Sequence, residues 1–233
     1  MIPLPEFSEQ NFYDAETHFH LMLREDRLAK LLAHWEAFKM TQDVPGSIVE
    51  CGVFKGTSFV RFALFRALNG GNQSSKLVGF DVFSDEFPDT KFEQDKAQRE
   101  LWIDTAGGSS ISQHQLADIL ESKGIENFEL VAGDAVLTIP DWAKRNPGAK
   151  IRLLNVDIDF YEPTEAVLEY LYPKVSYGGV ILLDNYGGEG STGLSYHGDT
   201  APVDAFVDKH SLKIRRFSYA SRPAYIVKGF PDL

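Results

Sequence analysis

Short apolar runs alternate with helical patterns along most of the chain. The first three runs are SIVEC, KLVGF and FELVA, and two more, IRLLNV and GGVILL, follow later. IRLLNV and GGVILL lack polar alternation, which favours central strands covered on both faces. Helix-forming segments such as FVRFALFRAL and QHQLADILESKG separate the runs. This order predicts an α/β fold with a mostly parallel sheet and helices on both faces.

The last two strand candidates differ from the others in their connection. LKIRRFSY and PAYIVKG follow each other without a helix between them. Such a pair predicts an antiparallel hairpin at the edge of the sheet. With the five earlier runs, the sheet is expected to have seven strands.

The N-terminal segment has a different pattern. Residues 14–40 carry apolar side chains at helical spacing, which predicts one or two helices packed on the sheet. Pro45 and Gly46 then break the chain before the first strand. We therefore expect a helical extension over residues 1–45, packed on a core domain over residues 46–233.

The pattern also loosens inside the core domain. Residues 84–112 are charged with scattered aromatics and contain the flexible-looking stretch GGSSIS. A segment of this length within a compact domain is usually functional, so we interpret it as a lid or substrate-binding insertion. Phe83, Phe87 and Trp102 either line the substrate side or pack locally.

Composition narrows the class of protein. The chain has 233 residues, 43% of them hydrophobic, which is enough for one sizeable core. We expect a cytoplasmic protein, since the apolar runs are too short to cross a membrane and the N-terminus lacks a signal pattern. The single cysteine, Cys51, cannot form an internal disulfide, which agrees with a reducing compartment. The net charge of −11, without a basic run, disfavours nucleic acid as a partner.

The segment after the first strand has the form of a ligand cradle. It reads ECGVFKGTS and leads from a strand through glycines into a helix, whose first N–H groups are free to bind. A dinucleotide site needs G-x-G-x-x-G, and here Phe54 stands in the place of the second glycine. NAD is therefore disfavoured. An acidic residue followed by G-x-x-x-G fits a cofactor with a cationic amino acid part and no phosphate.

The strand–helix–strand unit over residues 151–186 ends both of its strands in polar residues. The first strand leads to Asp157 and Asp159, and the second to Asp184 and Asn185. A right-handed crossover brings these ends to the same edge of the sheet. Hard oxygen ligands that converge there suit a divalent cation such as Mg²⁺. The alternative makes the aspartates helix caps and Asn185 a turn residue.

Carboxylates stand at the ends of the predicted strands along the whole sheet. Five successive predicted strands end at Glu50, Asp81, Asp134, Asp157 and Asp184. Like charges at one edge repel unless cations or hydroxyl and amine donors satisfy them. Asp81, at the tip of the second strand, is placed to accept hydrogen bonds from a ribose, although a helix cap is the alternative. S-adenosylmethionine offers a ribose diol, an amino group, an ammonium and a sulfonium.

Several of these stretches together resemble one family. ECGVFKGTSFVRFA, GFDVFSDEFP, NVDIDFYEPTEAVLEYLYPKVSYGGVILLDNYG and APVDAF resemble the macrocin (TylF-type) O-methyltransferases, from about residue 27 to residue 206. The resemblance implies a Rossmann-like class I methyltransferase fold. It also implies methyl transfer from S-adenosylmethionine, with Mg²⁺, to a hydroxyl of a sugar, nucleotide sugar or glycosylated natural product.

Carried over by position, the resemblance also assigns roles to residues. At the cofactor it implies Glu50, Gly52, Val53, Phe54, Gly56, Thr57 and Ser58 for the methionine end, Asp81 for the ribose, Gly133 and Asp134 for the adenine, with Asp157 nearby. Asp157, Asp184 and Asn185 would bind the metal, and Asp159 would be the general base, with His197 as the next candidate. The macrocin pattern usually has two aspartates where this chain has Asp184 and Asn185.

Two other functions remain open at this point. ECGVFKGTS and LLDN also resemble the catechol-type O-methyltransferases, which use Asp-Asn at the metal and act on aromatic diols. A non-catalytic S-adenosylmethionine-binding protein is the third possibility, because a fold alone does not fix function. We expect a small-molecule acceptor, a homo-oligomer, and neither nucleic acid nor membrane as a partner.

Overall fold

The computed structural model describes residues 1–70, 75–188 and 196–229. Its sheet has seven strands in the order β3-β2-β1-β4-β5-β7-β6. The strands are β1 Ser47–Cys51, β2 Leu77–Asp81, β3 Phe128–Ala132, β4 Ile151–Val156, β5 Val175–Leu183, β6 Arg215–Arg216 and β7 Ala224–Val227. Strands β1 to β5 are parallel, and β7 runs antiparallel to both β5 and β6. The predicted mostly parallel sheet with a C-terminal antiparallel hairpin is confirmed.

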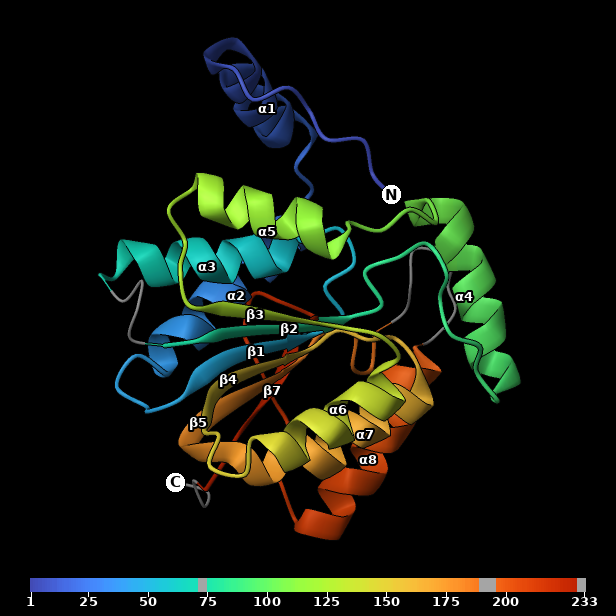
Figure 1. The fold of residues 1–233 in the computed structure, drawn as a ribbon. Helices are drawn as coiled ribbons and strands as arrows, with labels where there is room; N and C mark the ends of the chain where they lie inside the picture. The colour runs from blue at the N-terminus through green and yellow to red at the C-terminus, as the bar shows by residue number, and fades with distance from the viewer. Residues whose placement is uncertain (71–74, 189–195, 230–233) are drawn as a thin grey trace.

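Helices cover both faces of the sheet (Figure 1). The helices are α1 Glu9–Met22, α2 Glu25–Met40, α3 Thr57–Leu68, α4 Glu93–Ala106, α5 Gln113–Ser122, α6 Ala135–Arg145, α7 Tyr161–Leu171 and α8 His197–His210, with a 3₁₀ turn at Tyr172–Lys174. Helices α2, α3 and α5 lie on one face, and α6, α7 and α8 lie on the other. Alternate residues of β4 therefore enter different cores, Leu153 one and Leu154 the other. No helix among the described residues is long and apolar enough to cross a membrane.

The order of the strands fixes where a ligand binds. Strand β1 lies between β2 and β4, and the chain leaves β1 and β4 towards opposite faces. A crevice forms at such a switch point, beyond the carboxyl ends of the strands. Cys51 pairs with Val156, and Val156 with Leu183, so these strands end level with one another. Gly52, Asp157 and Asp184 therefore emerge side by side.

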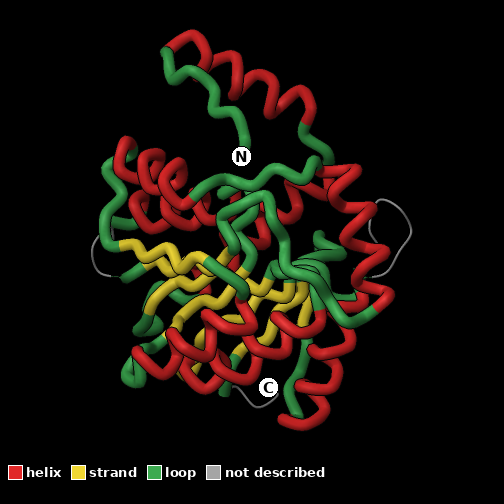
Figure 2. Tube along the Cα trace, turned by 45° about the vertical axis from the view of Figure 1, so that its right-hand side comes forward, coloured by secondary structure: helices red, strands yellow, loops and turns green. Residues whose placement is uncertain are grey.

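The two N-terminal helices behave differently. Helix α2 buries Ala29, Ala33, Ala37 and Phe38 against the sheet domain. Helix α1 has no buried residue and stands away from the rest of the molecule (Figures 1 and 2). Its Met22, part of the apolar pattern that predicted packing, is 78% exposed. Helical spacing defines an apolar face, but it does not determine that the face finds a partner within the chain.

The insertion over residues 84–112 contains helix α4, which stands beside the carboxyl edge of the sheet (Figure 1). The end of the insertion is packed against the protein, since Ser110 and Ile111 are buried. The hydroxyl of Ser110 and the N–H group of Ile111 each donate a hydrogen bond to the carbonyl oxygen of Phe54. Phe83 belongs to the core, whereas Phe87 lines a cavity. The side chain of Trp102 lies outside the described part of the structure.

Candidate active site

Two cavities open at the carboxyl edge of the sheet. The larger has a volume of about 1270 Å³ and the smaller about 280 Å³. Gly52, Phe54, Asp157 and Asp159 belong to the walls of both. The two cavities therefore meet at the acidic edge that the sequence predicted, and together they offer room for two ligands in contact.

Gly52 is the point where the turn after β1 passes closest to β4. Its φ is +91°, and a Cβ atom built there would lie 1.7 Å from the carbonyl oxygen of Asp157. No side chain fits in that space. The glycine lets the loop turn sharply and keeps the junction of the two cavities open.

Asp81 acts on the backbone of the same turn. Its Oδ2 accepts hydrogen bonds from the N–H groups of Val53 at 2.7 Å and Phe54 at 2.8 Å. Its Oδ1 accepts one from the N–H group of Phe83 at 3.1 Å. The carboxylate predicted to hold a ribose therefore also fastens the turn that shapes the site, and it lines the smaller cavity. The two N–H groups use both lone pairs of Oδ2, but Oδ1 keeps a second lone pair, so the two roles are compatible.

The other residues predicted for the adenine end lie in the smaller cavity. Gly133 and Asp134 both line it. Asp134 is also the N-cap of α6, because its side chain accepts a hydrogen bond from the N–H group of Val136 at 2.9 Å. Asp134 thus caps α6 and also lines the smaller cavity. Asp134 keeps a second carboxylate oxygen with which to meet a ligand.

Glu50 at the end of β1 is a buried carboxylate with one free oxygen. The side chain is 1% exposed, Oε1 accepts a hydrogen bond from Asn155 at 2.8 Å, and Oε2 has no hydrogen-bond partner among the described residues. Burial raises the pKa of Glu50 to about 7, while the neighbouring side chains of Ser58 and Asn155 lower it. Thr57 and Ser58 line the larger cavity, and Gly56, with a φ of +80°, starts the helix that carries them. An unsatisfied buried carboxylate fits a ligand that carries an ammonium.

The pKa of Glu50 predicts how stability depends on pH. Between its ordinary value of 4.5 and about 7, the folded protein holds a proton that the unfolded chain has lost. The contribution of Glu50 to the free energy of unfolding should therefore fall by about 3 kcal/mol as pH rises through this range. Glu50→Gln removes this contribution, so the variant should lose less stability than the wild type between pH 5 and pH 8 in denaturant titrations.

Glu121→Gln on the exposed surface of α5 is the matched control for this prediction. It should keep the pH dependence of the wild type. Calorimetry should also find that Glu50→Gln binds S-adenosylmethionine more weakly than the wild type. An unchanged pH profile of stability in Glu50→Gln would contradict the burial argument.

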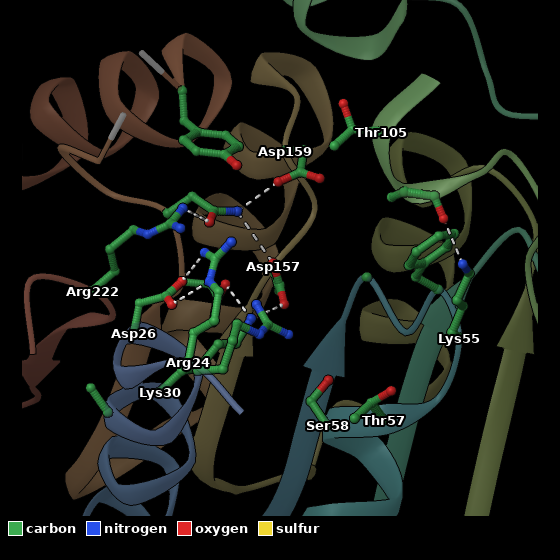
Figure 3. Close-up of a pocket in the computed structure, with 18 of the residues that line it drawn as sticks. Arg24, Asp26, Lys30, Lys55, Thr57, Ser58, Thr105, Asp157, Asp159 and Arg222 are labelled. Atoms are coloured by element: carbon green, nitrogen blue, oxygen red, sulfur yellow. Dashed lines mark hydrogen bonds and ion pairs between the residues drawn. The ribbon is translucent and has the colours of Figure 1, made fainter. Parts of the chain in front are cut away.

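The predicted metal ligands gather in one place, around a lysine. The Nζ atom of Lys30, on α2, lies 2.6 Å from Oδ2 of Asp184 and 3.2 Å from Oδ2 of Asp157 (Figure 3). Asn185 donates through Nδ2 to Asp159 at 2.7 Å and to Asp157 at 3.3 Å. The sequence-based expectation that Asp157 and Asp184 lie close enough to share one cation agrees with this geometry.

Charges in this cluster shift one another's pKa values. Burial and the charge of Asp184 raise the pKa of both Asp157 and Asp159. Burial alone would raise the pKa of Asp184, but Lys30 and His34 outweigh it and lower that pKa. Asp184 is therefore the carboxylate held most firmly in its ionised form. Asp159 is a stronger base than a free carboxylate.

Asp199, in the first turn of α8, extends the cluster. It is 3% exposed, and its carboxyl group lies close enough to Asp159 for the two charges to interact. Burial and the charge of Asp159 raise the pKa of Asp199 well above its ordinary value. Two buried carboxyl groups in contact cannot both stay ionised easily, so the pair retains a proton.

His197, the alternative base, is engaged elsewhere. Its Nδ1 lies 3.0 Å from Oδ1 of Asp95, whose other oxygen accepts a hydrogen bond from the N–H group of Tyr161 at 2.8 Å. The imidazole also stacks on the Tyr161 ring, at 5.8 Å between ring centroids. His197 is not among the residues that line the two cavities, whereas Asp159 lines both.

Sequence reasoning missed three charged residues of this site. Lys30 belongs to α2, Asp199 to α8, and Arg222 to the loop before β7. Nothing in their immediate sequence marks them as site residues. The only indication of the two cationic residues was indirect: an edge with so many carboxylates requires positive charges nearby.

The sequence matches one known protein family over most of its length. The sequence model of the family Macrocin-O-methyltransferase (TylF) matches residues 8–197. The chain belongs to the macrocin O-methyltransferase family. The expectation from the sequence motifs is thereby confirmed, and the matched range includes α2 with Lys30.

Two relatives of this macrocin-type protein come from Streptomyces species. The 8-demethyl-8-(2,3-dimethoxy-α-L-rhamnosyl)-tetracenomycin-C 4′-O-methyltransferase of Streptomyces olivaceus is 30% identical over 154 residues, 63% of this chain and 55% of that protein. The demethyldecarbamoylnovobiocin O-methyltransferase of Streptomyces niveus is 27% identical over 150 residues, 62% of this chain and 54% of that protein. The chain therefore spans about half the length of these two relatives.

A solved structure agrees with the fold. The crystal structure of a calicheamicin methyltransferase superposes with a TM-score of 0.73 at 24% sequence identity, and covers 96% of this chain and 88% of that one. The Rossmann-like class I methyltransferase fold predicted for the macrocin-type chain is confirmed.

Proposed function

We propose that the protein is an S-adenosylmethionine-dependent O-methyltransferase that acts on a hydroxyl of a sugar, nucleotide sugar or glycosylated natural product. The observation that carries the proposal is the shared wall of the two cavities. A cofactor with its adenosine part in the smaller cavity would extend past Gly52 into the larger one, where it would meet an acceptor beside Asp159. Family membership supports the reaction, and the rhamnosyl relative supports a sugar acceptor.

The residues present fit the cofactor. The smaller cavity, with Asp81, Gly133 and Asp134, suits the adenosine part. The unpartnered oxygen of Glu50 suits the ammonium of the methionine part, although Glu50 is itself not among the residues that line the two cavities. Gly52 leaves the space between the two. When bound, S-adenosylmethionine supplies a methyl group on a cationic sulfur, and the bond from carbon to the acceptor oxygen forms as the carbon–sulfur bond breaks.

Asp159 is the residue proposed to receive the hydroxyl proton. It lines both cavities, and burial and Asp184 raise its pKa. A carboxylate with a raised pKa accepts a proton at neutral pH more readily than an exposed one. The hydrogen bond from Asn185 holds its side chain in position. Positioning of the acceptor oxygen against the methyl group supplies much of the remaining acceleration.

The residues that the sequence predicted to bind Mg²⁺ contact other side chains of the protein. Within residues 1–70, 75–188 and 196–229 no group of three or more His, Cys, Asp or Glu residues could hold a metal ion. The predicted ligands Asp157 and Asp184 bind Lys30, and the amide oxygen of Asn185 accepts a hydrogen bond from Arg222 at 2.9 Å. In this arrangement the donor set does not fit a divalent cation, so no step of the proposed reaction uses one.

A screen of acceptors tests the proposed function. Purified protein with S-adenosylmethionine should convert at least one nucleotide sugar or glycoside to a monomethylated product, read by mass, and leave catechols unchanged. Conversion of catechols alone would support the catechol-type reaction instead. Cofactor binding by calorimetry without a product from any acceptor would support the non-catalytic binding protein.

A further inference from the structure

The cation at the centre of the acidic edge is a side chain of the protein. Lys30 Nζ contacts one oxygen of Asp157 and one of Asp184, and a metal bound to the same two oxygens would have to occupy the position of the ammonium. Magnesium–oxygen distances of about 2.0–2.1 Å leave no room for both. Lysine and metal are therefore mutually exclusive at these two carboxylates.

The packing of helix α2 against the core keeps Lys30 at these carboxylates. Ala29 and Ala33, on either side of Lys30 in sequence, are buried against the core. The helix also approaches the second oxygen of Asp184, because Nε2 of the buried His34 lies 3.5 Å from Oδ1. Both oxygens of this carboxylate thus face side chains of α2. A metal could take Asp184 only if packed residues of the helix moved.

The third predicted ligand is turned away from the cluster. Arg222 carries only hydrogen-bond donors, so its contact fixes the amide of Asn185 with Oδ1 towards the arginine. The NH₂ group of Asn185 then points to Asp159 and Asp157. A metal would meet the donor end of the amide instead of its oxygen.

We propose that Lys30 takes the place of a divalent cation in this protein and binds the acceptor hydroxyl. The proposal rests on the proposed function. An ammonium has three N–H donors, and the contacts to Asp157 and Asp184 account for two of them. Lys30 lines the larger cavity and is 17% exposed, so the third donor is placed to reach an acceptor oxygen.

This role follows from the charge that develops during methylation. The acceptor oxygen becomes more negative as its proton passes to Asp159, and a fixed cation beside it stabilises that charge. Lys30 keeps its own proton throughout.

Metal binding by the wild-type protein gives the most direct test. Calorimetric titration with MgCl₂ should show no binding at the site, and methylation rates should be the same in excess EDTA as in millimolar Mg²⁺. Metal-dependent methylation, or stoichiometric Mg²⁺ binding that Asp184→Asn abolishes, would overturn the proposal. The Mg²⁺ titration needs no acceptor, so it remains decisive if the acceptor screen fails.

Variants of α2 test the catalytic role of Lys30. Lys30→Met should lower kcat by about 10²–10³-fold, the usual effect of losing one oriented donor at a developing charge. S-adenosylmethionine binding should persist, and Lys39→Met on the exposed end of the same helix should act like the wild type. Recovery of Lys30→Met by Mg²⁺ would support a shared cation position. A Lys30→Met variant with the wild-type rate would overturn the role.

Discussion

Asp159→Asn is expected to lower the rate of methyl transfer by about 10²–10⁴-fold, the range over which a positioned general base contributes. Asparagine keeps an oxygen that can accept the hydrogen bond from Asn185, so the cluster should retain its shape. It cannot accept the hydroxyl proton. Single-turnover kinetics should show the loss in the chemical step, while calorimetry should show nearly unchanged affinity for S-adenosylmethionine.

The control for this variant is Asp141→Asn on the exposed face of α6, where Asp141 pairs with Arg145. Its rate should match the wild type. An unchanged rate in Asp159→Asn would contradict the assignment of the base. His197→Gln would then be the next variant to measure, although His197 is tied to Asp95.

Gly52→Ala is expected to have the largest effect on the folded state. The new Cβ would lie 1.7 Å from the carbonyl oxygen of Asp157, so β1 and β4 would have to separate at their ends. We expect a loss of at least about 3 kcal/mol of stability, or roughly 10 °C in Tm for a domain of this size, because packed backbone must move. Cofactor binding should be lost as well.

A second glycine separates steric clash from backbone strain. Gly124 also has a positive φ, of +66°, but a Cβ there meets nothing within 4 Å. Gly124→Ala should cost only about 1 kcal/mol for the left-handed conformation and leave methylation intact. Thermal unfolding of both variants gives the comparison, and equal Tm losses would contradict the importance of the close approach at Gly52.

The strand ends are the part of the site that the sequence predicts well. Asp157 and Asp184 follow apolar runs in a strand–helix–strand unit, and parallel neighbours must end at the same edge. Gly52 was predictable for the same reason, because a glycine after the first strand marks the turn at the switch point. These positions depend on local pattern and on one general rule of topology.

The sequence does not predict which side chains from distant segments meet at the site. Lys30 is 127 residues from Asp157 along the chain, and the helical pattern of α2 shows which face is apolar but not which loop the lysine meets. Arg222 lies in an irregular loop, where no periodicity constrains its side chain. The sequence therefore predicted a divalent cation from the carboxylates alone, whereas the structure shows a lysine between them.

The roles of single carboxylates are equally hard to separate beforehand. An aspartate at a strand end either caps the backbone or binds a ligand, and both uses favour the same position in the sequence. Asp81 and Asp134 each bind backbone N–H groups and also line the smaller cavity. For these residues, a role in capping the backbone and a role in ligand binding are therefore compatible.

A labelled methyl group tests whether the protein methylates a sugar hydroxyl. The wild-type protein is incubated with S-adenosylmethionine that carries a deuterated methyl group and with a nucleotide sugar or glycoside, and fragment masses locate the label. We expect the label on a sugar oxygen with the wild type, and a strongly reduced yield with Asp159→Asn. Label on no acceptor despite bound cofactor, or equal labelling by Asp159→Asn, would contradict this expectation.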